Sequence, residues 1–66
     1  MKEIIRDDKG TPRLEVYIEK FQSHNRLCLK MVDYGDYVVS FDAKIIPHLI
    51  KALKKVEKNE RQHERV

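Results

Sequence analysis

The apolar residues of this chain change their spacing at Asp42, and that change restricts the folds open to it. Before Asp42, apolar and polar residues alternate over Arg13–Phe21 and Arg26–Asp33, which is the period of a strand with two different faces. After Asp42, apolar residues recur at the three- and four-residue spacing of a helix and form one stripe roughly 140° wide. This apolar stripe consists of Ile45, Ile46, Leu49, Ile50, Leu53 and Val56. The chain is therefore expected to form a sheet followed by one amphipathic helix.

Runs of turn-forming residues divide the segment before Asp42 into four strands. Gly10 and Pro12 lie in the first turn, and Gly35 lies in the last. The predicted strands are Lys2–Arg6, Arg13–Phe21, Arg26–Asp33 and Tyr37–Phe41, and the predicted turns are Asp7–Pro12, Ser23–Asn25 and Tyr34–Asp36. Turns of this length suit hairpins. The predicted fold class is therefore α+β: a four-stranded antiparallel β-meander with one C-terminal amphipathic helix packed on one face.

Alternation assigns the strand residues to two faces of the sheet. The inner face, expected under the helix, holds Leu14, Val16, Ile18, Leu27, Leu29, Met31, Val39 and Phe41. The outer face holds Tyr17, Phe21, Cys28, Val32 and Val38 together with Arg13, Glu15, Glu19, Arg26, Lys30 and Ser40.

Asp42 has the chemistry of a helix N-cap, but Pro47 leaves two alternatives for the start of the helix. Either the helix begins directly after Asp42 and Pro47 removes one hydrogen bond, or Ala43–Ile46 form a looser turn and the regular helix begins near Pro47. Apolar burial is expected to end at Val56, where the stripe ends. The predicted domain covers residues 1–58, and residues 59–66 are predicted to form a charged tail that continues the helix for a turn or two and then frays.

The size of the chain favours self-association. A domain of 66 residues buries only roughly 60% of the surface of its unfolded chain, and small domains rely on disulfides, a metal or a partner subunit. Cys28 is the single cysteine and cannot form a disulfide within the chain, and the three histidines show no zinc-ligand spacing. A homodimer is therefore expected.

The N-terminal residues lack the apolar run of a signal peptide, and no stretch approaches the ~20 apolar residues of a membrane span. Together with the lone cysteine, these features predict a cytoplasmic protein with no membrane partner.

Excess positive charge is confined to the last part of the chain. Residues 1–50 hold eight Lys or Arg and eight Asp or Glu, whereas residues 51–66 hold six against three. The face of the helix opposite the apolar stripe holds Lys44, Lys51, Lys54, Lys55 and Lys58, with no acidic residue among them. Such a face suits phosphate backbones, which point charges bind without reading sequence. It is also typical of the solvated side of an ordinary amphipathic helix, and both interpretations stay open.

The outer sheet face offers a second candidate site. Tyr17 and Phe21 lie among cations, and aromatic side chains beside Arg or Lys can stack bases while the cations hold phosphates. Glu15 and Glu19 favour a competing interpretation, in which this semi-apolar face binds a protein partner or a second copy.

No constellation of catalytic residues is present in the sequence. Asp7 and Asp8 are adjacent in a turn, where consecutive side chains diverge, and His24 and His48 stand apart from any nucleophile. There is no Gly-rich phosphate loop and no nucleophile with a base at motif spacing. We predict a non-enzymatic protein without a cofactor, a metal or a small-molecule substrate.

Two stretches resemble the single-stranded-DNA-binding transcriptional coactivator family, that is, positive cofactor four and its bacterial and phage relatives. Arg6–Gly10 followed by Arg13–Phe21 resembles the first hairpin of that family, and Val39–Asp42 resembles its last strand and helix start. The resemblance implies a homodimer whose strands bind single-stranded nucleic acid. The matching positions are Arg13, Tyr17, Lys20, Phe21, Arg26 and Lys30.

Two functions are therefore predicted as alternatives. The first is a small, non-enzymatic module that binds single-stranded nucleic acid, through the six positions above and through Lys51, Lys54, Lys55 and Lys58. The second is a protein-binding regulator or inhibitor of a larger complex, which would use the outer sheet face.

Overall fold

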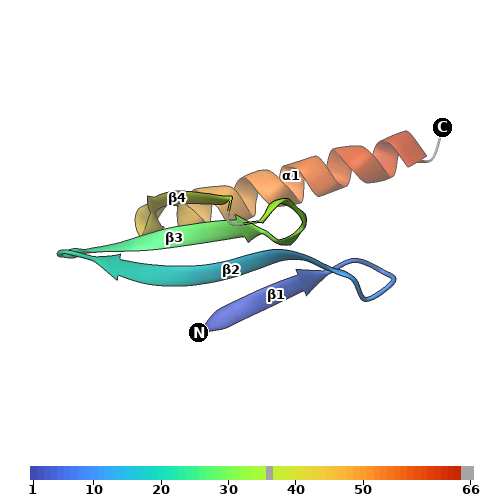
Figure 1. Cartoon of the computed structure of the whole chain (residues 1–66). Coiled ribbons are helices and arrows are strands. Elements are labelled where there is room, and N and C mark those ends of the chain that lie inside the picture. The colour runs from blue at the N-terminus through green and yellow to red at the C-terminus, as the bar shows by residue number, and fades with distance from the viewer. Residues whose placement is uncertain (36, 65–66) are drawn as a thin grey trace.

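The computed structural model describes residues 1–35 and 37–64, without the side chains of residue 34 and residues 62–64. One antiparallel sheet has the strand order β1-β2-β3-β4, and one helix, α1, follows it (Figure 1). The elements are β1 (Lys2–Arg6), β2 (Pro12–Phe21), β3 (His24–Met31), β4 (Val38–Asp42) and α1 (Ile46–Glu64). The predicted α+β meander with a C-terminal helix is confirmed. The last residue of the turn predicted at Tyr34–Asp36, and the tail residues 65–66, lie outside the described residues.

The β2–β3 turn is tighter than the sequence indicated. Phe21 pairs with His24, so the two strands are joined by Gln22 and Ser23 alone, and Gln22 takes the left-handed conformation at φ 55°. The predicted loop Ser23–Asn25 is thus too long, because its last two residues belong to β3. At the other end β3 stops at Met31, and Val32–Tyr34 form a 3₁₀ helix instead of continuing the strand.

The register confirms the two predicted faces for the residues that lie in strands, whereas Val32, predicted on the outer face, lies in the 3₁₀ helix after β3. Val16 of β2 pairs with Leu29 of β3, which pairs with Val39 of β4, and residues directly opposite one another share a face. The adjacent row on the outer face joins Tyr17, Cys28 and Ser40. The inner face lies toward α1, because a single cleft is lined by Leu14, Val16 and Leu27 from the sheet and by Ile46 and Leu49 from the helix.

The second of the two predicted helix starts is correct. Asp42 accepts a hydrogen bond from the backbone N–H of Lys44 at 2.9 Å and caps a 3₁₀ turn over Ala43–Ile45. Regular α-helix begins only at Ile46, so Pro47 lies in the first turn, where no intrahelical partner awaits its missing N–H. The helix then continues through residues 59–64, supported by a Glu57–Arg61 ion pair at 3.6 Å.

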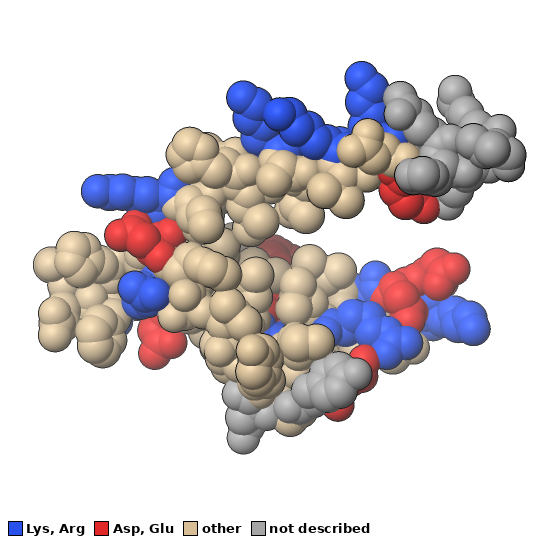
Figure 2. Space-filling model, turned by 90° about the horizontal axis from the view of Figure 1, so that it is seen from above, with Lys and Arg blue, Asp and Glu red and all other residues tan. Residues whose placement is uncertain are grey.

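One copy of the chain buries very little. Among the described side chains only Leu27 and Cys28 are fully buried, at 4% and 2% exposure. The expectation that burial extends along the apolar stripe to Val56 is wrong for this single chain: Ile50 is 48% exposed, and Leu53 and Val56 are more exposed still. The reason is geometric, because α1 follows the sheet closely only at its beginning and leaves a gap beyond it (Figure 2).

Candidate nucleic-acid interface

Four lysines of α1 form an exposed cationic surface. We call Lys51, Lys54, Lys55 and Lys58 the lysine ridge. All four are exposed, and the helical period places Lys51, Lys55 and Lys58 opposite the apolar stripe and Lys54 at its border. Figure 2 shows blue side chains along the side of α1 that faces away from the sheet. No ion pair joins a ridge lysine to an acidic side chain of the described residues.

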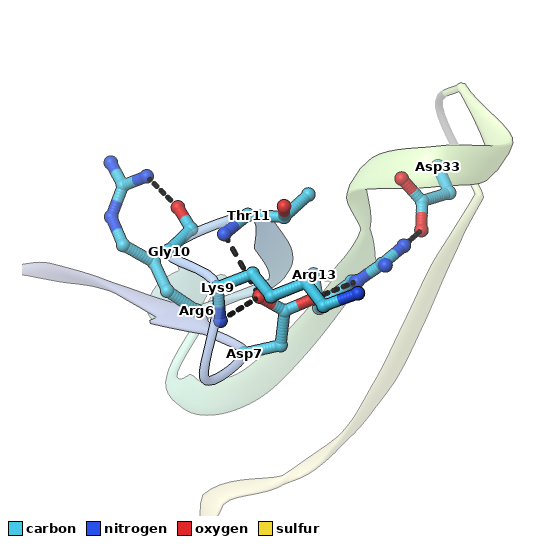
Figure 3. A network of polar contacts seen from close by, with 7 residues as sticks. All are labelled: Arg6, Asp7, Lys9, Gly10, Thr11, Arg13 and Asp33. Carbon is cyan, nitrogen blue, oxygen red and sulfur yellow. Dashed lines mark hydrogen bonds and ion pairs between the residues drawn. The ribbon is translucent and has the colours of Figure 1, made fainter.

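Arg13, a predicted site residue on β2, is held by two carboxylates. Its Nε donates to Asp7 Oδ2 at 3.0 Å, and its Nη1 donates to Asp33 Oδ2 (Figure 3). Asp33 beside the guanidinium raises the pKa of Arg13, and Asp7 adds to that effect. Arg13 therefore ties the β1–β2 loop to the 3₁₀ turn after β3, and its charge is already balanced within the chain.

Asp7 also shapes the β1–β2 loop. Its Oδ1 accepts from the backbone N–H of Lys9 at 2.9 Å and of Thr11 at 3.0 Å. The N–H of Thr11 contributes most to holding the pKa of the Asp7 carboxyl below its ordinary value; partial desolvation opposes this, and Arg13 and the Lys9 N–H reinforce it. Gly10 completes the loop at φ 84°. Asp7 is therefore structural in the way that turn-forming aspartates usually are.

In the middle of the outer face, Glu15 partly offsets the charge of two lysines. Its two carboxylate oxygens lie 3.3 Å from Lys2 Nζ and 3.7 Å from Lys30 Nζ. Lys2 Nζ also lies 5.3 Å from the centroid of the Tyr17 ring, so a cation already covers that aromatic face. Alternation alone could not predict that Lys2 lies beside Tyr17, because that contact depends on the register of β1 against β2.

The far end of the outer face holds a shallow cleft of about 420 Å³, lined by Glu19, Phe21, Arg26, Cys28, Val38 and Ser40. Phe21 is 60% exposed there, whereas Arg26 donates to Ser40 Oγ at 3.1 Å and to its carbonyl at 3.2 Å. Burial raises the pKa of the Cys28 thiol, and Glu19, with Oε2 3.8 Å from Sγ, raises it further. Cys28 is therefore protonated at neutral pH, in a cleft with one cation and one carboxylate.

The structure does not bring the ten predicted site residues together. Lys20 is two residues after Ile18 on β2, so its side chain lies on the same, inner face of the sheet, away from Tyr17 and Phe21. The alternation in the sequence already carried that signal. The lysine ridge lies on the side of α1 away from the sheet, and the outer face lies on the side of the sheet away from α1 (Figures 1 and 2). The two candidate surfaces are thus on opposite sides of the molecule.

The fold and these surfaces define a small α+β protein with one uncompensated cationic helix face. Comparison with protein-family models, with curated proteins and with solved structures finds no match to the chain. Within residues 1–35 and 37–64, no helix combines the length and the apolar character needed to cross a bilayer. The same part of the chain holds no group of three or more His, Cys, Asp or Glu side chains placed to bind a metal ion. The resemblance to the coactivator family stays a prediction.

Proposed function

We propose that this protein binds nucleic acid without reading its sequence, by laying a phosphate backbone along the lysine ridge. The observation that carries the proposal is the contrast in charge pairing. The ridge lysines have no ion pair with a described acidic side chain, whereas Arg13 is held by Asp7 and Asp33. Lysine is a flexible point charge, so a row of lysines suits phosphate more than it suits the edge of any one base.

The dimensions of the ridge support this assignment. Lys51 and Lys58 are seven residues apart, which is about 10 Å along a helix axis. That length is about three phosphate spacings of ~3.4 Å, so it spans about four successive phosphates on one strand of a duplex. Neutralising phosphates releases condensed counterions, so such binding is strong at low salt and weakens steeply as salt rises.

Single strands are the preferred form in this proposal because Phe21 remains exposed for stacking, at 60%. Phe21 and the ridge lie on opposite sides of one copy. A strand that stacks on Phe21 therefore reaches the ridge only by passing around an edge of the molecule, or by meeting the ridge of another copy.

Salt dependence of binding to a labelled oligonucleotide tests the proposal. If four lysines each neutralise one phosphate, the slope of log K against log salt is about −2.8 for a single strand and about −3.6 for a duplex. Raising salt from about 50 to about 200 mM should then weaken binding ~50-fold to ~150-fold. Fluorescence anisotropy with a single strand and a duplex of equal length measures both slopes.

Two charge variants of equal net charge locate the site. Replacing the four ridge lysines by Gln is expected to remove most of the salt dependence. The matched control carries Lys2→Gln, Arg6→Gln, Lys9→Gln and Lys20→Gln, which remove the same charge from the sheet half, and it should keep the wild-type slope. Equal losses in the two variants would show that net charge alone drives binding and would contradict a site on the ridge.

A further inference from the structure

The single chain exposes more surface than a compact protein of its mass. Its accessible surface is 6043 Å², whereas a compact monomer of 7.9 kDa exposes about 4,400 Å². Its radius of gyration is 14.2 Å, against roughly 10.8 Å for a compact 66-residue domain. About 1,600 Å² of surface is therefore in excess of what a self-sufficient domain of this size would leave in water.

Much of the exposed apolar surface lies where α1 and the sheet face each other. An open cleft of about 470 Å³ separates them, and Glu3 is the one charged residue in its lining. On the sheet side, Ile5 and Ile18 are 50% and 47% exposed. On the helix side, Leu53 is 58% exposed, and Val56, at 64%, lies beyond this cleft.

We propose that this cleft is filled by α1 of a second copy, in a two-fold symmetric dimer. Each copy carries both halves of the contact: the C-terminal half of an apolar stripe with no sheet beneath it, and a sheet face with no helix above it. A two-fold axis exchanges these halves, so the stripe of each chain covers the open sheet face of the other. One symmetry operation therefore removes both apolar surfaces from water.

The size of the uncovered surface favours a second copy over a small apolar ligand. Covering the excess on both chains would bury roughly 3,200 Å² in total, which is within the range of obligate dimers. A ligand that filled the cleft would still leave Val56 in water, because Val56 does not line it. Lys51, Lys55 and Lys58 lie on the side of α1 opposite the stripe and stay in solvent in this dimer, whereas Lys54 borders the stripe beside Leu53 and Val56.

Mass and concentration dependence of the full chain test the dimer. Sedimentation equilibrium at about 10 to 100 µM should give twice the 7.9 kDa chain mass. The midpoint of urea unfolding should rise with protein concentration, because two unfolded chains form from one native dimer. A monomer in this range, whether folded, unfolded or carrying a small molecule in native mass spectrometry, overturns the proposal, and so does a midpoint that is independent of concentration.

Variants on the two sides of α1 locate the interface. Leu53→Glu with Val56→Glu should weaken the dimer by ~100-fold or more, because two carboxylates would be buried without partners. The control pair Lys55→Glu and Lys58→Glu adds two carboxylates to the same helix on the ridge side and should change the dimer dissociation constant by less than about threefold. Equal weakening by both pairs overturns the assignment of the stripe as the interface. If Leu53→Glu with Val56→Glu prevents folding altogether, the dependence of the wild-type unfolding midpoint on protein concentration still tests the dimer.

Discussion

The outer and inner faces of the sheet differ in how completely one copy of the chain covers them. At the centre of the outer face, side chains of the sheet itself cover the surface: Cys28 is 2% exposed beneath neighbours that include Glu19, and Glu15 pairs with two lysines. The end of this face, at Phe21 and Val38, stays open. On the inner face, coverage depends on α1, which leaves Ile5 and Ile18 about half exposed. Long polar side chains can cover a sheet face without help from another element, whereas an apolar sheet face must be covered by a second layer of secondary structure.

The largest expected effect comes from a substitution at Leu27, the fully buried residue of the inner face among the described side chains. Leu27→Ala should lower the free energy of unfolding by about 3 kcal/mol, because it removes a buried side chain at the base of the cleft and leaves a cavity. For so small a protein this is a large share of total stability. Urea unfolding at one fixed protein concentration measures the loss.

The neighbouring position on the outer face is the control for that experiment. Cys28 is as deeply buried as Leu27, but its side chain is smaller and lies beside Glu19 in a half-polar cleft, so Cys28→Ala should cost about 1 kcal/mol. Equal losses at the two positions would show that the faces contribute equally and would remove the contrast drawn above.

A smaller effect is expected at the edge of the outer face, where Asp7 organises the β1–β2 loop. Its pKa is lowered in the folded state, so its stabilising contribution is present above the unfolded value near 3.8 and is lost as pH falls through the lower folded value. Asp7→Asn should therefore be less stable than wild type at neutral pH, and the difference should shrink on acidification. Urea midpoints between about pH 6 and pH 2 measure it; a difference that is constant with pH would contradict the role of the charge.

The smallest expected effect concerns nucleic-acid binding by the outer face. Glu15→Gln removes the carboxylate that Lys2 and Lys30 share. Because the ridge lies on the other side of the molecule, the salt slope for a single strand should stay within experimental error. A slope steeper by about 1.4, the contribution of two further phosphates, would show that the nucleic acid binds to the outer sheet face and would contradict the ridge as the site.

The fold could be predicted because its signals are local. Alternation within Arg13–Phe21 and the helical stripe after Asp42 each report one element, and the strand order follows from short turns. The end of β2 and the start of β3 could not be predicted in the same way, because the tight turn between them needs Gln22 in a left-handed conformation that its residue type does not favour.

The pairing of charged side chains at the candidate site could not be predicted from local signals. Arg13 meets Asp33, which is 20 residues away, only because β2 and β3 pair in one particular register. Glu15 looked repulsive toward phosphate, but in the structure it forms ion pairs with Lys2 and Lys30, and its negative charge is offset by theirs. The apolar stripe likewise indicates which side of α1 avoids water, but not which surface covers it.

The strand order β1-β2-β3-β4 also has a consequence for how the protein folds. Every strand pairs with its neighbour along the chain, so the sheet forms through contacts that are close in sequence and require the closure of short loops only. Proteins dominated by such local contacts have low contact order, which is associated with rapid folding. The slow part of folding would then be the placement of α1, because its apolar stripe has few partners until the sheet beneath it exists.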